Sequence, residues 1–289
     1  MILVTADVGG SKTAVAITRD GQRIFWLTGS GAAVRPGRTM TSASTIADLA
    51  RKALAQAGLL RADGLVVGAA GAGRLSDAEE VRAVLARERI ADRVVVVSDV
   101  TLALEALGSP TGAVLVAGTG SIAIGRGPDG TTERQGGYGW QMGDQGGGYW
   151  IGLEALRAVG LAYDGRGPAT SLSSGISAAI SAVDFRDVVA WSTIASPREV
   201  AGLARPVMEA AATGDAVATA IVDRAAEWLS GLLRALADRF STGTIPLGFT
   251  GGLLTEGSLL IGQVRGRLDP RYAPPITIDP LVGGPRLFG

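Results

Sequence analysis

Two glycine-rich segments of this sequence have the composition of phosphate-binding turns. One is Asp7-Val8-Gly9-Gly10-Ser11-Lys12-Thr13 and the other is Gly118-Thr119-Gly120-Ser121, and each follows an apolar run that predicts a strand. Glycines let the backbone approach a phosphate closely, and the successive N–H groups of such a turn form an anion-binding concavity. We expect the pair to hold one polyphosphate, although either segment alone could be an ordinary hairpin turn. The candidate ligands are Gly9, Gly10, Ser11, Lys12, Thr13, Gly118, Thr119, Gly120 and Ser121.

Carboxylates are the first candidates for proton transfer and metal binding, because the chain has no His and no Cys, and a Lys or Tyr is the less favoured base. That composition excludes a Ser-His-Asp triad, a thiolate nucleophile and a His-based zinc site. Asp99 follows the apolar run 94–97, and ligands of open α/β sheets lie beyond such strand ends. It could accept the proton of a hydroxyl that attacks a γ-phosphoryl group, or it could cap the helix expected at 101–107. Asp7, at the end of the first strand, can hold Mg²⁺, usually through water.

A third segment combines glycines with aromatic side chains. Residues 136–146 read Gly-Gly-Tyr-Gly-Trp-Gln-Met-Gly-Asp-Gln-Gly and precede an expected helix. Asp144 could cap that helix while the aromatic rings pack, or it could bind ligand hydroxyls while a ring covers a sugar. Gly251-Gly252, after the strand expected at 245–250, would allow an adenine ring to lie against the backbone. Neither a GxxxxGK[ST] loop nor a complete GxGxxG is present, which disfavours P-loop and dinucleotide-binding folds.

The expected elements are of the α/β type and partly duplicated. Strands are predicted at 2–6, 13–18 and 23–28, with Asp20-Gly21 as a hairpin turn, and the succession returns at 113–117 and 122–125 with Asp129-Gly130. Gly9 precedes Asp20 by eleven positions and Gly118 precedes Asp129 by the same eleven. This spacing favours a duplicated hairpin unit, one copy per lobe, over two unrelated hairpins. Further strands are expected at 65–69, 94–97 (fully buried) and 245–250.

Helical periodicity fills most of the remaining sequence. Helices are expected at 46–57, 77–89, 101–107, 147–159, 178–190, 197–213 and 216–240. In the last of these, an apolar stripe contains Ala225, Trp228, Leu229, Leu232 and Leu236. Gly108-Ser109-Pro110 would break the preceding helix, so we place the lobes at 1–109 and 110–289.

Composition narrows the setting in which the protein acts. Lys+Arg and Asp+Glu both total 27, so the net charge is zero and no broad surface attracts nucleic acid or an anionic membrane. The apolar runs are too short to span a bilayer, and the N-terminus lacks the pattern of a secretory signal. We therefore expect a cytoplasmic protein with neither nucleic acid nor membrane as partner.

The order of these motifs resembles that of the BadF/BadG/BcrA/BcrD-type ATPases, and within them the N-acetylglucosamine kinases. Residues 143–152, Gly-Asp-Gln-Gly-Gly-Gly-Tyr-Trp-Ile-Gly, look like the GDEGSxYWIG motif of those kinases. The resemblance implies a two-lobed actin-like ATPase (ribonuclease H-like) fold, with a duplicated mixed-sheet core and a nucleotide cleft between lobes that close over the substrate. It also implies Mg·ATP-dependent phosphorylation of an amino sugar, first N-acetylglucosamine at O6, with glucosamine and N-acetylmuramate as alternatives. Homodimers are common in this family, which favours a homodimer here.

The resemblance also assigns roles to individual residues. Asp7 would orient Mg²⁺, the two glycine turns would hold phosphates, and Asp99 would be the base that activates the sugar hydroxyl. The adenosine would lie between Gly251 and Gly252. The sugar would contact Asp99, Thr119, Gly137, Tyr138, Gly139 and Asp144.

Three departures from the family pattern bear on the substrate and on the fold. Ala32-Ala33 stand where the family has a sugar-binding Asn, and Gln145 replaces the Glu of GDEGS. The sequence ends at Phe288-Gly289, so the family's closing helix should be short or missing. A sugar- or nucleotide-binding regulator without efficient turnover is the alternative that the missing Asn favours, whereas Asp7 and Asp99 argue against it. An ATPase that drives a partner is less favoured, and the absence of cysteines excludes the cluster-binding dehydratase activators.

Overall fold

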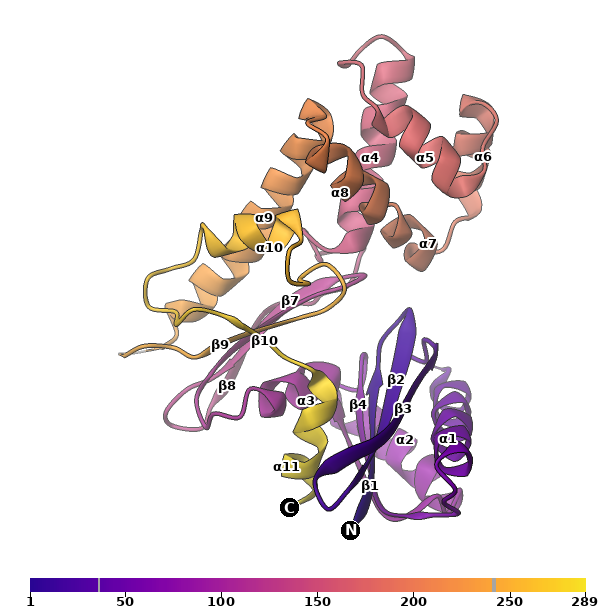
Figure 1. Ribbon diagram of the computed structural model, residues 1–289, viewed down its shortest axis with the longest axis vertical. Coiled ribbons are helices and arrows are strands. Elements are labelled where there is room, and N and C mark those ends of the chain that lie inside the picture. The colour runs from indigo at the N-terminus through magenta and orange to yellow at the C-terminus, as the bar shows by residue number, and fades with distance from the viewer. Residues whose placement is uncertain (36, 241–242) are drawn as a thin grey trace. The chain divides into compact units, whose positions relative to one another are not determined.

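The chain forms two compact units in the computed structural model, which describes residues 1–35, 37–240 and 243–289 (Figure 1). Unit 1 contains Met1–Val114 together with Ile278–Gly289, and unit 2 contains Leu115–Thr277. The boundary expected at 109/110 lies close to the observed one. Residues 278–289, however, which the sequence-based division places in the second lobe, pack with unit 1.

Unit 1 contains a mixed five-stranded sheet with the strand order β3-β2-β1-β4-β5. The first three strands form an antiparallel meander, and β4 and β5 then continue parallel to β1. Asp20 and Gly21 have φ values of 50° and 82°, which is the positive-φ hairpin turn that their sequence predicts. The strands are β1 Ile2–Val8, β2 Lys12–Arg19, β3 Gln22–Ser30, β4 Ala62–Ala69 and β5 Ala91–Ser98.

Strand β5 corrects the expectation of a fully buried strand at 94–97. It lies at the edge of the sheet, and residues 94–98 are only partly buried. Its Val residues pack on both faces of the sheet, which explains the continuous apolar run, but one of its two flanks has no neighbouring strand. The continuous apolar run therefore shows that both faces of the strand are covered, and it does not show that the strand lies in the centre of the sheet.

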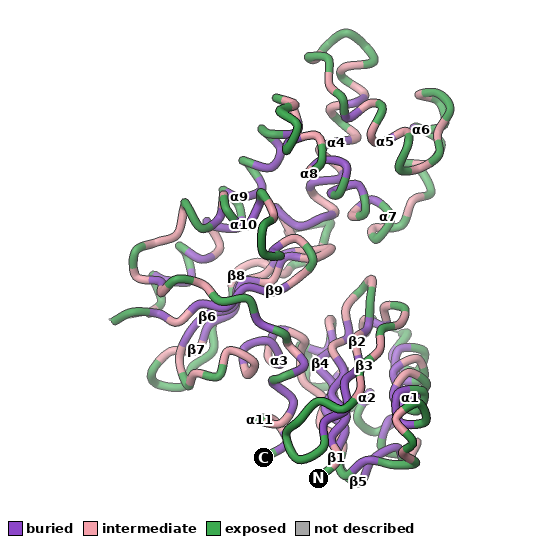
Figure 2. The backbone as a smooth tube through the Cα atoms, viewed as in Figure 1, coloured by how far each residue is buried: buried purple, intermediate pink, exposed green. Residues whose placement is uncertain are grey.

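Helices cover both faces of the unit 1 sheet. Helices α1 (Thr39–Gln56) and α2 (Leu75–Arg87) pack against the face that carries Val4, Ala6 and Val8, and Figure 2 shows the buried and exposed sides of α1. Gly58, with φ of 70°, follows the C-terminal end of α1 and stops the helix, as the sequence predicts.

The opposite face, with Leu3 and Val66, packs against α3 (Asp99–Ala106) and the C-terminal residue Phe288. This C-terminal segment comprises the 3₁₀ turn η1 (Pro280–Gly283) and the five-residue helix α11 (Gly284–Phe288), so the closing helix is present but short. Arg93 fixes its end by donating a hydrogen bond of 2.8 Å to the carbonyl oxygen of Phe288. The segment thereby holds α3, whose first residue is Asp99, on this face of the sheet.

Unit 2 repeats the first three strands of unit 1 in a second five-stranded sheet, with the order β10-β9-β6-β7-β8. The consecutive strands β6-β7-β8 are neighbours, as β1-β2-β3 are, so the predicted repetition of strand order is present. The β7–β8 connection spans residues 127–131, and Gly130 has φ of 81°. The strands are β6 Gly112–Ala117, β7 Ser121–Arg126, β8 Thr132–Gly136, β9 Leu247–Thr250 and β10 Ile276–Thr277.

Helices make up most of the rest of unit 2. Two expected helices are each divided in the structure. The predicted 178–190 helix is interrupted because Ser181 adopts a left-handed conformation and Asp184 begins a capping box. The predicted 197–213 helix is interrupted at Leu203. The helices are α4 Gly148–Tyr163, α5 Leu172–Ile180, α6 Phe185–Ile194, α7 Pro197–Gly202, α8 Ala204–Ala212, α9 Ala216–Ala237 and α10 Leu259–Arg265.

The buried stripe of α9 differs from the predicted one. Trp228 is 49% exposed, and Leu233 and Ala226 are buried in its place. Helix α10 was not expected from the sequence. None of the helices in the described part of the chain is long and apolar enough to cross a membrane.

Candidate functional site

The first glycine turn, residues 9–13, is held by backbone contacts within unit 1. The N–H of Gly9 donates to the carbonyl oxygen of Lys12 at 2.9 Å, and the N–H of Ala32 donates to that of Gly9 at 3.2 Å. A Cβ on Gly31 would overlap the Gly10 carbonyl, so only glycine fits there. On Gly10 itself, no atom of the described residues lies within 4 Å of the position that a Cβ would take. The turn is therefore supported from behind and open at Gly10, as a phosphate cradle requires.

The side chains of this turn differ in their accessibility. Lys12 is exposed, whereas Thr13 is fully buried in β2, between Val8 and Gly29 of the neighbouring strands. The Thr13 hydroxyl has no hydrogen-bond partner among the described residues. Because it is buried, a phosphate at the open face would meet the turn's backbone and Lys12 before the Thr13 hydroxyl.

Asp7 and Asp99 lie in unit 1, at the ends of strands β1 and β5. Burial raises the pKa of Asp7 to about 7, with further increases from the charges of Asp99 and Asp279 and a decrease from Lys12. Burial also raises the pKa of Asp99 to about 6, against the lowering effect of backbone N–H groups, including that of Val100. A carboxylate with a pKa near neutrality is a suitable proton acceptor at physiological pH.

Asp99 is not the cap of α3, which corrects one of the two roles left open for it. The N-cap is Ser98, whose Oγ accepts the N–H of Thr101 at 3.2 Å. Asp99 is the first helical residue, where the positive end of the helix dipole favours a negative charge.

The carboxylates of unit 1 are the groups that could bind a magnesium ion. Among the described residues, no three acidic side chains converge closely enough to form a direct metal shell. Asp7 nevertheless experiences the charges of Asp99 and Asp279, and a divalent cation would relieve that repulsion. Mg²⁺ usually keeps several waters and binds through one or two carboxylates. Asp7 therefore fits a cation held through water.

Asp279 is a residue of this region that the sequence analysis missed. It belongs to the C-terminal segment, forms an ion pair with Arg23, and accepts the N–H of Leu281 at 3.1 Å at the start of η1. The Asp-Pro pair at 279–280 signals a turn, but nothing in the sequence signals that this turn belongs to unit 1.

The second glycine turn, residues 118–121, packs against the start of α4 within unit 2. The N–H groups of Gly148 and Tyr149 donate to the carbonyl oxygens of Gly118 and Thr119 at 2.8 and 2.9 Å. A Cβ on Gly147 would lie 2.6 Å from the carbonyl carbon of Gly120. The glycine at 147 is thus required by the close packing of α4 on the turn. The N-cap of α4 is Gly147, so Asp144 does not cap this helix, which removes one of the two roles left open for it.

Asp144 instead connects the glycine-aromatic loop, residues 136–146, with the second glycine turn. Its Oδ1 accepts the N–H of Gly139 at 3.3 Å, and the backbone N–H of Ser121 is near enough to the carboxylate to lower its pKa. The hydroxyl of Ser121 donates to the carbonyl oxygen of Gln145 at 2.8 Å. Burial raises the pKa of Asp144, while these N–H groups lower it. Gly136, Gly137 and Gly139 have φ values of 72°, 70° and 87°, which explains the glycines of the loop.

The aromatic residues of this loop remain accessible. Tyr138 is 59% exposed and lies under the guanidinium of Arg134, and Trp140 is 44% exposed with its ring centroid 5.0 Å from that of Tyr149. An exposed aromatic face of this kind can cover a sugar ring.

Gly251 and Gly252 lie against the end of β6, next to the second glycine turn. The N–H of Leu253 donates to the carbonyl oxygen of Ala117 at 3.1 Å. Gly251 has φ of 103°, and a Cβ there would overlap the Ala117 carbonyl, whereas no described atom lies within 4 Å of a Cβ on Gly252. The structure thus brings the predicted residues of unit 2 together around residues 117–121, and those of unit 1 around the ends of β1 and β5.

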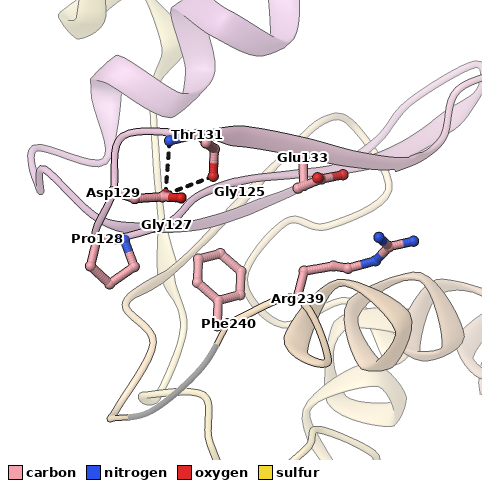
Figure 3. A pocket seen from close by; sticks show the side chains of 8 residues that line it. All are labelled: Gly125, Gly127, Pro128, Asp129, Thr131, Glu133, Arg239 and Phe240. Atoms are coloured by element: carbon pink, nitrogen blue, oxygen red, sulfur yellow. Dashed lines mark hydrogen bonds between the residues drawn. The ribbon is translucent and has the colours of Figure 1, made fainter.

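A separate hollow of about 190 Å³ lies at the other end of the β7–β8 hairpin (Figure 3). It is lined by the 127–131 connection, Arg239 and Phe240, whereas the second glycine turn precedes the first residue of β7. We do not assign this hollow to the candidate site, since none of the predicted site residues lines it.

Comparison with known proteins identifies the family. The profile of the BadF/BadG/BcrA/BcrD ATPase family matches residues 6–272. The chain belongs to this family. It is 27% identical over 278 residues, 93% of this chain and 91% of the relative, to the N-acetylmuramic acid/N-acetylglucosamine kinase of Clostridium acetobutylicum.

Solved structures show the same fold. A Chromobacterium violaceum protein assigned as an N-acetylglucosamine kinase is 26% identical, with a TM-score of 0.81 over 100% of this chain and 99% of that one. A ROK family glucokinase from Streptomyces griseus is 17% identical, with a TM-score of 0.70 over 99% of both chains, and supports the fold alone. These matches and the two five-stranded sheets confirm the expected α/β actin-like ATPase fold.

The open face of Gly10 leads to a direct test of the first glycine turn. Gly10→Ala should leave the free energy of unfolding unchanged or slightly raised, because its φ is ordinary and the added methyl meets no described atom. We expect nucleotide affinity to fall at least about tenfold, since the methyl occupies the space a phosphate must enter. Calorimetric titration with Mg·ADP measures this, and Gly231→Ala in α9 is the matched control. Unchanged affinity in Gly10→Ala would remove this turn from the nucleotide site.

Proposed function

We propose that this protein is an ATP-dependent amino-sugar kinase that transfers the γ-phosphoryl group of ATP to a sugar hydroxyl, in the first place O6 of N-acetylglucosamine. The observation that carries the proposal is the pair Asp7 and Asp99 at the strand ends of unit 1, both with a pKa raised toward neutrality. Family membership and the sugar kinase relatives support this assignment.

Asp99 would act as the general base. Its carboxylate accepts the proton of the sugar hydroxyl as that oxygen forms a bond to the γ-phosphorus, and the bond to the β-phosphate oxygen breaks to release ADP. Phosphoryl transfer needs little covalent help from the protein, so positioning and charge stabilisation account for most of the catalysis.

The other predicted residues would bind and orient the substrates. The first glycine turn with Lys12, and the second glycine turn, would donate N–H and ammonium groups to the phosphates, and Gly251-Gly252 would lie against the adenosine. Mg²⁺, held through water by Asp7, would neutralise charge on the phosphates. Asp144 and the backbone of residues 137–139 would contact the sugar, and Tyr138 would cover its ring.

The choice of sugar is the part of the proposal for which this chain differs most from the family pattern. Ala32 is buried and its N–H is bonded to Gly9, so this position supports the first glycine turn but offers no amide to a sugar. N-acetylglucosamine remains the first candidate, with glucosamine and N-acetylmuramate as alternatives. A homodimer belongs to the same proposal, and light scattering of the purified chain tests it.

Substitution of the proposed base separates catalysis from binding. Asp99→Asn should lower sugar-dependent turnover by about 10³-fold or more, because the amide cannot accept the proton. Stability and Mg·ADP affinity should remain near those of the wild type, since the cap of α3 is Ser98 and not Asp99. Ser98→Ala is the contrasting variant, and we expect it to lose about 1 kcal/mol of stability. Full turnover in Asp99→Asn would contradict the assigned mechanism.

The pH dependence of kcat/KM for the sugar should reflect the same carboxylates. Activity requires the ionised form, so kcat/KM should be constant above about pH 8 and fall at lower pH as Asp7 and then Asp99 take up protons. A profile that stays flat down to pH 5 would argue against Asp99 as the base.

Protonation of Asp7 and Asp99 does not unfold the protein, so acid unfolding driven by these two groups does not explain a loss of activity at low pH. Both folded-state pKa values lie above 3.8, the ordinary value of an aspartate, so the folded protein binds more protons than the unfolded chain between about pH 4 and 7. Their contribution therefore stabilises the folded state at low pH and is lost as pH rises. Thermal unfolding measured across the same pH range is the control.

A further inference from the structure

The carboxylate of Asp144 lies against the second glycine turn and not only beside the glycine-aromatic loop. Its Oδ2 is so close to the Cα of Gly120 that a Cβ on that glycine would overlap it. The same carboxylate accepts the N–H of Gly139 in the loop, and the backbone N–H of Ser121 in the turn is near enough to lower its pKa. One side chain thus joins two segments that are separated by 18 residues of the sequence, 121 to 139.

A carboxylate suits this contact better than an amide does. Its two oxygens are acceptors only and can take one N–H from each segment. An amide of the same shape has one acceptor oxygen, and its NH₂ group would face a second N–H donor. Asp144 also has φ of 59°, a left-handed conformation in which Asp and Asn are the commonest residues after glycine. The backbone conformation and the carboxylate together aim the side chain at the turn.

Other contacts support the same connection. Gln145 accepts the hydroxyl of Ser121, and Gly147 packs on the backbone of Gly120. These contacts hold the chain on the C-terminal side of Asp144 to the turn, whereas on its N-terminal side Tyr138 and Met142 are exposed. Asp144 is therefore the side chain through which a change in the exposed part of the loop would reach the turn.

We propose that Asp144 is a positioning residue for the nucleotide: it fixes the shape of the second glycine turn and couples that turn to the loop that would hold the sugar. This inference rests on the proposed function and adds to the sugar contact that the family resemblance implies for Asp144. Sugar hydroxyls that bind the carboxylate would alter its hold on Ser121 and Gly139. By linkage, sugar would change nucleotide affinity and nucleotide would change sugar affinity by the same factor.

The test measures nucleotide binding without any sugar. The full-length protein, Asp144→Asn and Asp144→Gly are titrated with Mg·ADP by calorimetry. We expect both variants to bind about tenfold more weakly, since the turn loses an N–H acceptor. Asn keeps the preference for a left-handed backbone and Gly relieves it, so a loss common to both reports the carboxylate. Met142→Ala, an 80% exposed residue of the same loop, is the matched control and should bind as the wild type does.

Two outcomes would overturn the inference. Unchanged Mg·ADP affinity would leave Asp144 as a sugar contact only, and tighter binding would show that its negative charge opposes the phosphates instead of positioning the turn. Thermal unfolding of each variant should stay near the wild-type value, because a drop that parallels the affinity loss would indicate general destabilisation.

A second titration, in the presence of N-acetylglucosamine, measures the coupling. The factor by which sugar changes Mg·ADP affinity should approach one in Asp144→Asn and persist in Met142→Ala, and persistence of that factor in Asp144→Asn would contradict the coupling. If the protein were not a sugar kinase, wild-type affinity would not respond to sugar, yet the sugar-free loss would remain. The two failures are therefore distinguishable.

Discussion

The structure of unit 2 depends on the close approach of the first turn of α4 to the backbone of residues 118–121. Gly148 and Tyr149 donate their N–H groups to carbonyl oxygens of this turn, and a Cβ on Gly147 would lie 2.6 Å from the backbone of Gly120. At Gly147 a hydrogen atom is the only substituent that fits. Because α4 is seated there, Asp144 and Gln145 reach the turn from the preceding loop, and the glycine at 147 is a packing requirement as much as a sequence signature.

Unit 1 meets the same need for an exposed, rigid turn by a different arrangement. Its first glycine turn is supported by the backbone of residues 31 and 32, and the carboxylates of Asp7 and Asp99 lie at the ends of β1 and β5. Burying Asp7 near Asp99 and Asp279 costs free energy that the fold must offset elsewhere, and it raises the pKa of Asp7 to about 7. In a chain without histidine, such carboxylates are the available groups that titrate near neutral pH.

Features that depend on residues close together in the sequence could be predicted from it. The Asp20-Gly21 turn, the repeated strand order and most helices follow from glycine positions and apolar periodicity. The remaining features depend on tertiary contacts. Periodicity could not reveal the left-handed Ser181 that divides one helix, nor that β5 lies at a sheet edge. The return of residues 278–289 to unit 1, which brings Asp279 toward Asp7, is a long-range contact without a local signal. Asp144 was predicted as a functional residue, but its contact with Ser121 requires the folded loop.

The kinase assignment is tested most directly by the rate of ADP release from Mg·ATP with each of five sugars: N-acetylglucosamine, glucosamine, N-acetylmuramate, N-acetylmannosamine and glucose. We expect strong stimulation by one amino sugar, with N-acetylglucosamine first, little hydrolysis without sugar, and a phosphorylated sugar formed in step with ADP. ATP binding without stimulation by any of the five would contradict the kinase assignment and favour a regulatory nucleotide-binding protein. Rapid hydrolysis that no sugar changes would instead indicate an ATPase that acts on a partner.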